Sequence, residues 1–505
     1  MIAHEASLWR ELRPSPDRWS GAAQITLLCV LTVAMSMILR VPEAALSCYL
    51  IFFAWKDDSG SMIVTGLILI MAASLGLPLV QPLLRLAVDS SAWRLGLLCG
   101  ITLFGMMLAH ASRAGPMLGT AAFILAFAVT LYDVVPVPDL LSRALAWMWV
   151  VVFIPMALLI GVGIFLGTSP KERAEQLIAR RREALAAPQS EAAIEMRDDG
   201  GTRMDVWLSK AWLLGFARGD TAARLAAEAE ASYLDLVRAQ AGLPPRAGPP
   251  APAFPADKAP LFEADLFSNP AHLRFGVKVL IAVIITYVTY TVAGLSEIHT
   301  AMITCYFVAL STGGETRHKI TLRLTGAVMG GLLGTLVLFI LMPHMHDLGH
   351  LTLLVVLGAF PAAWIGVGSE RVAYAGWQMA LCYFLVILGG FGPSMDPMVA
   401  LNRIIGVAFG IVVVWGVFSL LWPVSAARKV DELLDQFDTE IAALTGYTLS
   451  GRAAMRLNAL VAEAERLYRY ASFEGAQEIA HAHRIDEARQ RMYRQLRYAT
   501  GEPHA

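Results

Sequence analysis

The sequence predicts an all-α polytopic membrane protein: two six-helix transmembrane halves in a parallel pseudo-repeat, plus a cytoplasmic helical domain. The first observation is composition. The chain has 505 residues, 56% of them hydrophobic and 16% charged, whereas an average soluble domain is about 25% charged. Its mean hydropathy is +0.56. These values exclude the disordered and nucleic-acid-binding classes.

The second observation is a series of twelve apolar runs. A bilayer core of about 30 Å needs about 20 apolar residues per helix. On this basis we expect spans near 22–40, 44–55, 61–84, 92–110, 115–132, 143–167, 273–293, 299–312, 321–342, 349–367, 372–390 and 403–422. The second run of each half has only about twelve apolar residues and ends in a polar, Gly-containing break. Such interrupted segments at matching places point to a substrate path near the repeat interface. The alternative is that they are two short helices with ordinary cytoplasmic turns, which would give the same sequence pattern.

The third observation is the pair of polar blocks, which sets the domain boundaries. We expect an N-terminal segment, a first membrane half, a helical region, a Pro-rich linker, a second membrane half and a helical tail, at 1–20, 21–168, 169–242, 243–265, 266–423 and 424–505. Basic residues concentrate on one side of this topology, so both termini and the middle domain of this multi-pass protein should be cytoplasmic. The two polar blocks are expected to pack together.

The halves share local pairs of residues, which indicates a repeat. Cys48-Tyr49 and Cys305-Tyr306 hold the same place in the second helix of each half, and Arg143 and Arg403 open the sixth. Since six is an even number of helices, the halves should be parallel, with a pseudo-two-fold axis along the membrane normal.

Four cations lie within or at the mouth of spans: Lys278, Arg323, Arg143 and Arg403. Charges there are costly and usually functional, so the four predict a path for anions. Each is also close enough to an interface to snorkel instead. Tyr49 and Tyr306 on the short helices are candidates for lining the path.

The candidates for proton coupling are Asp58, Glu315, Asp133 and His299. A carboxylate in a poorly hydrated site takes up a proton near neutral pH, and histidine titrates there unaided. The alternative is that these residues are ordinary polar groups at helix ends.

Other features favour structural roles. Gly326, Gly330 and Gly334 recur every four residues, as at a close helix contact. His344, His346, Asp347 and His350 could bind a metal, but a polar loop is favoured, and no metal or cofactor is expected. No P-loop, nucleophile elbow or HExxH occurs, so the sequence does not predict an enzyme.

The segments ADLFSNPAHLRFGVKVLIAVIITYVTY, RHKITLRLTGAVMGGLLG, GSERVAYAGWQMAL and LLWPVSAAR resemble the fusaric acid resistance, or aromatic acid exporter, family. The likeness is specific over about 264–428 and weaker over 16–170. It implies an inner-membrane subunit of a multidrug efflux pump, driven by the proton gradient, with a periplasmic adaptor and an outer-membrane channel as partners.

The function expected from these observations is proton-coupled export of aromatic carboxylic acids or other toxic organic compounds. The expected partners are the small organic acid, the lipid bilayer, the adaptor and channel, and a possible second copy of the chain; nucleic acid is not expected. The alternatives are a passive organic-anion channel of the same fold and a non-transporting membrane scaffold.

Overall fold

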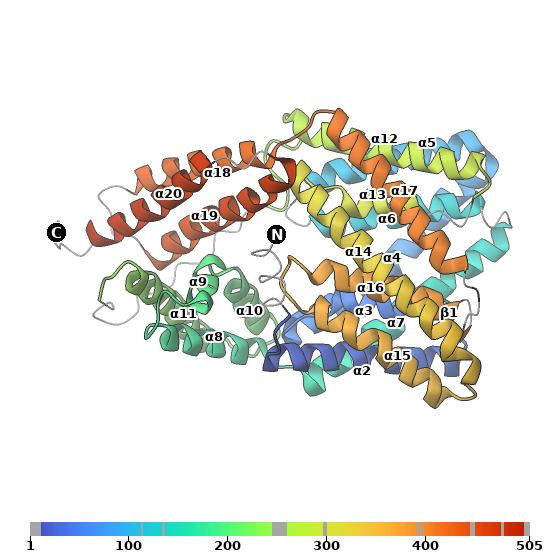
Figure 1. The fold of residues 1–505 in the computed structure, drawn as a ribbon, viewed down its shortest axis with the longest axis horizontal. Helices are drawn as coiled ribbons and strands as arrows, with labels where there is room; N and C mark the ends of the chain where they lie inside the picture. Colours follow the sequence, from blue (N-terminus) through green and yellow to red (C-terminus); the bar gives the residue numbers. More distant parts are fainter. Residues whose placement is uncertain are drawn as a thin grey trace.

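The computed structural model describes residues 12–112, 115–133, 137–244, 260–295, 300–389, 392–393, 396, 398–444, 450–475 and 479–498. Nearly all of them are helical. Apolar helices fill one part of the molecule, and polar helices form a second part beside it (Figure 1). Eight helices in the described residues are long and apolar enough to cross a bilayer. The predicted all-α, multi-pass membrane protein is confirmed.

The helices follow the predicted order. The first six apolar helices are α2 (Pro16–Leu39), α3 (Ala44–Ala54), α4 (Ser59–Asp89), α5 (Ser91–His110), α6 (Gly115–Thr130) and α7 (Pro138–Leu166), with the 3-10 turn η1 (Leu131–Asp133) after α6. The polar helices α8 (Pro170–Ala184), α9 (Glu191–Asp198), α10 (Thr202–Leu213) and α11 (Gly219–Gln240) come next.

The second apolar set is α12 (Pro270–Val292), α13 (Thr300–Val308), α14 (Gly313–Ile340), η3 (Met342–His344), α15 (Leu348–Gly366), α16 (Ala373–Ile387) and α17 (Met398–Leu420). A two-residue antiparallel pair, β1 (Leu388–Gly389) and β2 (Gly392–Pro393), follows α16. The chain closes with α18 (Ala426–Ala443), α19 (Gly451–Ala471), η4 (Ser472–Glu474) and α20 (Ile479–Tyr498).

The second apolar helix of each half is short, as predicted. The 11 residues of α3 and the nine described residues of α13 extend about 16 and about 14 Å, roughly half of the bilayer core. Each is followed by a capped long helix. The Asp58 carboxylate accepts from the Ser61 N–H at 2.7 Å, and the Thr312 hydroxyl accepts from the Glu315 N–H at 3.3 Å.

The membrane core is built jointly by the two sets of apolar helices. α5 packs against α12 and α6 against α13, while α15 packs against α2 and α16 against α3. Two large apolar clusters each combine residues from both sets of helices. One joins Phe52 and Met156 to Tyr383, and the other joins Leu98 to Phe275.

The helix α14 begins at Gly313, eight residues before the predicted start at 321. Its first two turns are too polar to be recognised as part of a span, but they contact the tail. The Arg317 guanidinium donates to the Phe473 carbonyl at 2.7 Å, and Glu315 pairs with Arg466 at 3.0 Å. Arg323 therefore lies nearly three turns into the helix, whereas the sequence predicted one.

The polar blocks pack together, as expected. A shared core takes Tyr233 and Val237 from α11, Phe437 from α18, Val461 from α19 and Met492 from α20. Tail and membrane helices meet where η4 and α19 reach the start of α14.

The predicted packing role of the glycine series is confirmed. A Cβ on Gly326 or Gly330 would overlap the backbone carbonyl of Ala375 or Met379 on α16, and one on Gly334 would lie 2.9 Å from Val386. Only glycine, which has no Cβ, permits this close approach of α14 to α16.

Candidate functional site

Arg323 is the most deeply placed cation of the second half. It lies about 15 Å along α14 from Gly313 and is 2% exposed. Its Nε donates to the Thr304 hydroxyl on α13 at 3.1 Å, and its Nη1 donates to the Tyr374 hydroxyl on α16 at 2.8 Å. Since α14 runs between α13 and α16 (Figure 1), Arg323 joins helices of the two apolar clusters.

Lys319 lies one turn before Arg323 on α14. Its Nζ stands 5.1 Å from the centre of the Tyr374 ring, so Tyr374 contacts both cations. Among the described residues, neither cation has a carboxylate oxygen within 4.0 Å, and the nearby Glu315 pairs with Arg466 instead. A charge in the membrane costs at least about 2.5 kcal/mol when it is uncompensated. Two neighbouring cations without a carboxylate partner favour the binding of an anion.

The short helix α3 contributes a further aromatic hydroxyl. The Gln378 amide, 1% exposed on α16, donates to the Tyr49 hydroxyl at 3.4 Å. The six side chains that meet here come from α3, α13, α14 and α16, and we name them the Arg323 cluster: Tyr49, Thr304, Lys319, Arg323, Tyr374 and Gln378. Hydrogen-bond donors beside aromatic rings suit a ligand with a carboxylate and an aromatic body.

The other predicted substrate-binding residues lie apart from this cluster. Lys278 donates to the Trp422 carbonyl at 2.7 Å and so ties α12 to the end of α17. The Tyr306 hydroxyl shares a hydrogen bond with Thr102 on α5. Arg143 is exposed on α7. Arg403 is half-buried on α17, near enough to Glu43 and Cys382 to act on both electrostatically.

The predicted proton-coupling acids differ in their surroundings. Asp58 is 1% exposed at the start of α4, and burial raises the pKa of its carboxyl. Glu315 is paired with Arg466. Asp133 pairs with Arg94 at 3.1 Å and accepts from the Tyr287 hydroxyl at 2.6 Å. His299 lies outside the described residues.

Sequence reasoning missed four members of the cluster: Thr304, Lys319, Tyr374 and Gln378. Lys319 stood in a segment taken for a loop. Its spacing of four from Arg323 places both on one helix face once α14 is extended. Gln378 is a polar residue within an apolar run, which is itself a signal. Thr304 and Tyr374 are identified only by packing.

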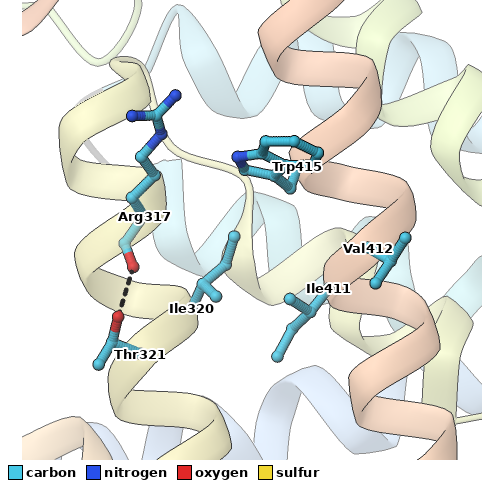
Figure 2. Close-up of a pocket in the computed structure, with 6 residues that line it drawn as sticks. All are labelled: Arg317, Ile320, Thr321, Ile411, Val412 and Trp415. Atoms are coloured by element: carbon cyan, nitrogen blue, oxygen red, sulfur yellow. Dashed lines mark hydrogen bonds between the residues drawn. The ribbon is translucent and has the colours of Figure 1, made fainter. Parts of the chain in front are cut away.

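A cavity of about 300 Å³ lies between α14 and α17, lined by Arg317, Ile320, Thr321, Ile411, Val412 and Trp415. Figure 2 shows the Arg317 guanidinium directed away from the apolar side chains, and the Thr321 hydroxyl bonded to the Arg317 carbonyl at 3.1 Å. Val412 and Trp415 are 63% and 52% exposed, so this cavity is a shallow groove on the outer surface of the helix layer. The Arg323 cluster, in which Thr304, Arg323 and Gln378 are buried, is the better candidate site.

Comparison with known proteins gives a family match within the second apolar set. Residues 281–417 match the fusaric acid resistance protein-like family, a range that holds five of the six cluster residues. The chain is thus a multi-pass membrane protein with a fusaric-acid-resistance-type region, and the resemblance found in its sequence is confirmed.

Similarities to individual proteins are more informative than the family match. The chain is 24% identical to multidrug resistance protein MdtO of Escherichia coli K12, over 83% of this chain and 71% of the relative. It is 35% identical to MdtO of Shigella flexneri over 37% and 28%, and 26% identical to inner membrane protein YccS of E. coli K12 over 33% and 22%. No solved structure matches the chain.

Proposed function

We propose that this protein is a bacterial inner-membrane efflux transporter that exports aromatic carboxylic acids or related toxic organic anions. The observation that carries the proposal is the pair of cations on α14: Arg323 is buried and Lys319 is half-buried, and neither has a carboxylate partner among the described residues. The family match and the similarity to a multidrug resistance protein support the direction of transport.

In this proposal the substrate carboxylate binds between Arg323 and Lys319. The guanidinium offers directed donors and the ammonium a point charge. The aromatic body of the substrate packs against Tyr49 and Tyr374, which reach the cluster from different helices. Arg403 would be the next cation along the proposed path, because α17, which bears it, packs against both α14 and α16.

We further propose coupling to protons through Asp58. It is the buried acid of the three described candidates, whereas Glu315 and Asp133 are each paired with an arginine, Arg466 and Arg94. A carboxyl that desolvation favours in its neutral form can take up and release a proton at moderate pH. A periplasmic adaptor and an outer-membrane channel would complete the export path.

The two apolar sets are also proposed to be a parallel repeat with one functional site. Their contacts correspond: α2 with α15 matches α12 with α5, and α3 with α16 matches α13 with α6. The residue corresponding to Arg323 in the first half is Ile63, by the alignment of Thr65-Gly66 with Thr325-Gly326. One half would therefore supply the cations, while the other supplies Tyr49.

Sealed inverted vesicles containing the protein test the proposal. With an imposed proton gradient, a labelled aromatic acid should accumulate, and a protonophore should abolish its accumulation. Uptake that only equilibrates would identify the passive channel, and no uptake in vesicles that also contain the adaptor and channel would favour the scaffold.

Variants locate the site in the same assay. Arg323→Ala should lower accumulation at least about tenfold at unchanged membrane abundance, because a charge-assisted hydrogen bond contributes about 1.5–3 kcal/mol. Arg323→Lys, which keeps the charge but loses the planar fork, should be intermediate. The exposed Arg143→Ala is the matched control. Equal activity in the Arg323 and Arg143 variants would refute the assignment.

A further inference from the structure

Two histidines and two carboxylates converge at the end of the membrane part next to the polar helices. His272, in the first turn of α12, is 2% exposed. Its Nε2 lies 3.3 Å from Asp265 Oδ1 and 3.5 Å from Glu263 Oε2, and the three donor atoms all lie within 4.8 Å of one another. On the other side of the ring, its Nδ1 lies 2.8 Å from Nδ1 of His110, the last residue of α5.

The separations match those of metal ligands. In a tetrahedral zinc site with bonds of about 2.0–2.2 Å, neighbouring ligand atoms stand about 3.3–3.6 Å apart. The two distances from His272 Nε2 are close to this range without any movement. Glu263 is 59% exposed and Asp265 46%, so solvent reaches the open side, where a water would complete the coordination.

Both the imidazole and one carboxylate have a second partner that fixes their orientation. If His272 donates Nδ1–H to His110, its Nε2 lone pair faces the two carboxylates, which is the tautomer that a metal requires. Asp265 Oδ2 accepts from the Asn269 amide at 2.8 Å, and Asn269 also caps α12 through the Ala271 N–H at 3.0 Å. These contacts resemble the outer shell of a built metal site.

The backbone also holds the carboxylates in place. The Glu263 N–H donates to the Ala111 carbonyl at 2.9 Å, and Ser112 and Phe262 form an antiparallel bridge. The segment that enters α12 is therefore attached to the end of α5. A cation here would link the two apolar sets, since α5 belongs to the first and α12 to the second.

We propose that Glu263, Asp265 and His272 bind a zinc-class divalent cation, oriented by His110 and Asn269. The sequence analysis did not single out these three ligands, although they are close together in the chain, and His110, which orients His272, lies 162 positions away from it. The outer-loop histidines that the sequence offered do not converge in the described structure. His350 pairs with Asp347 at 3.0 Å, and His344 faces the carbonyl of Ile340.

The test uses the full-length protein purified in detergent and stripped with a chelator. Titration with Co²⁺ should give the visible absorption of a tetrahedral ion at one equivalent, and Zn²⁺ should displace it. Zn²⁺ should also raise the melting temperature. Glu263→Gln and Asp265→Asn should each weaken binding at least about tenfold, and His110→Asn should weaken it about 10–100-fold as a positioning residue.

The control is His350→Ala, which removes an exposed histidine from the outer-loop pair and should leave the titration unchanged. Without metal, Glu263→Gln and Asp265→Asn should have the melting temperature of the parent protein, which would show that they fold. Zn²⁺ binding that survives Glu263→Gln with Asp265→Asn, or that is lost with His350→Ala, would overturn the proposal. So would a melting temperature that responds to pH but not to Zn²⁺, because His272 would then be only a charged partner of the two acids.

Discussion

The carboxylate of Glu474 holds two helix starts together. It accepts from the Gly314 N–H at the beginning of α14, and from the Ala426 N–H at 3.0 Å and the Ser425 hydroxyl at 2.8 Å at the beginning of α18. Backbone N–H groups at a helix start lack intrahelical partners and carry partial positive charge. A single anion therefore fastens the tail to the helix that bears Arg323 and Lys319.

Replacing Glu474 should loosen this attachment. Glu474→Ala should destabilise the protein by about 1–3 kcal/mol, because charged hydrogen bonds to two helix starts are lost. Glu474→Gln, which keeps an acceptor, should cost less. The measurement is the melting temperature in detergent. Glu432→Ala is the control, since Glu432 only pairs with Lys429 at an exposed position and such pairs contribute little. An equal loss in both alanine variants would contradict this role.

Asp58 allows a test of proton binding that spares the fold. Burial raises the pKa of its carboxyl above the usual 3.8, so the folded state binds this proton more tightly than the unfolded state does. Its contribution to stability therefore falls as pH rises from 3.8 through the raised pKa. Asp58→Asn keeps an equally good helix cap and should flatten this part of the pH–stability curve.

The same variant should retain substrate exchange but lose proton-driven accumulation. Asp133→Asn, at an acid held by Arg94, should keep accumulation. If Asp58→Asn accumulates substrate as the parent does, Asp58 is not the coupling group.

Among the elements, the apolar helices could be predicted from the sequence, and the interrupted pair α3 and α13 with them, because run length alone decides whether a helix spans the bilayer. The start of α14 could not. The polar turn that carries Lys319 is helical because it contacts the tail, which is a tertiary effect. Of the residues in the candidate site, the sequence predicted only Arg323 and Tyr49. The other members could not be predicted for the same reason, because they become neighbours through the packing of α13, α14 and α16.

The contact between α14 and α16 should be sensitive to one methyl group. In Gly330→Ala the new Cβ would overlap the Met379 carbonyl, which is backbone and cannot rotate away. We expect a loss of about 1–3 kcal/mol, seen as a lower melting temperature and as reduced transport, because Arg323 would shift from Tyr374. Gly416→Ala on α17 meets no atom within 4 Å and should be neutral. Neutral behaviour of Gly330→Ala would contradict the close packing.

At the scale of the whole molecule, the two apolar sets exchange helix pairs. α5 and α6 complete the cluster around α12 and α13, and α15 and α16 complete the one around α2 and α3. Neither set buries its apolar surfaces alone. Burial of that surface stabilises a membrane fold through packing, so each half depends on the other more than on the covalent link between them.

This exchange predicts that the chain can be cut within 245–259 and still assemble. The two fragments, expressed together with a tag on one, should co-purify and bind substrate, whereas each alone should aggregate or be degraded because its exchanged helices lack partners. Gly276→Leu tests the interface, since a Cβ at Gly276 on α12 already lies 2.7 Å from the Leu103 carbonyl on α5. It should abolish co-purification. Gly96→Leu, on α5, should not, because a Cβ at Gly96 meets no atom within 4 Å. If each fragment were folded and monodisperse by itself, the halves would be independent units, and the Arg323 cluster would have to work without Tyr49.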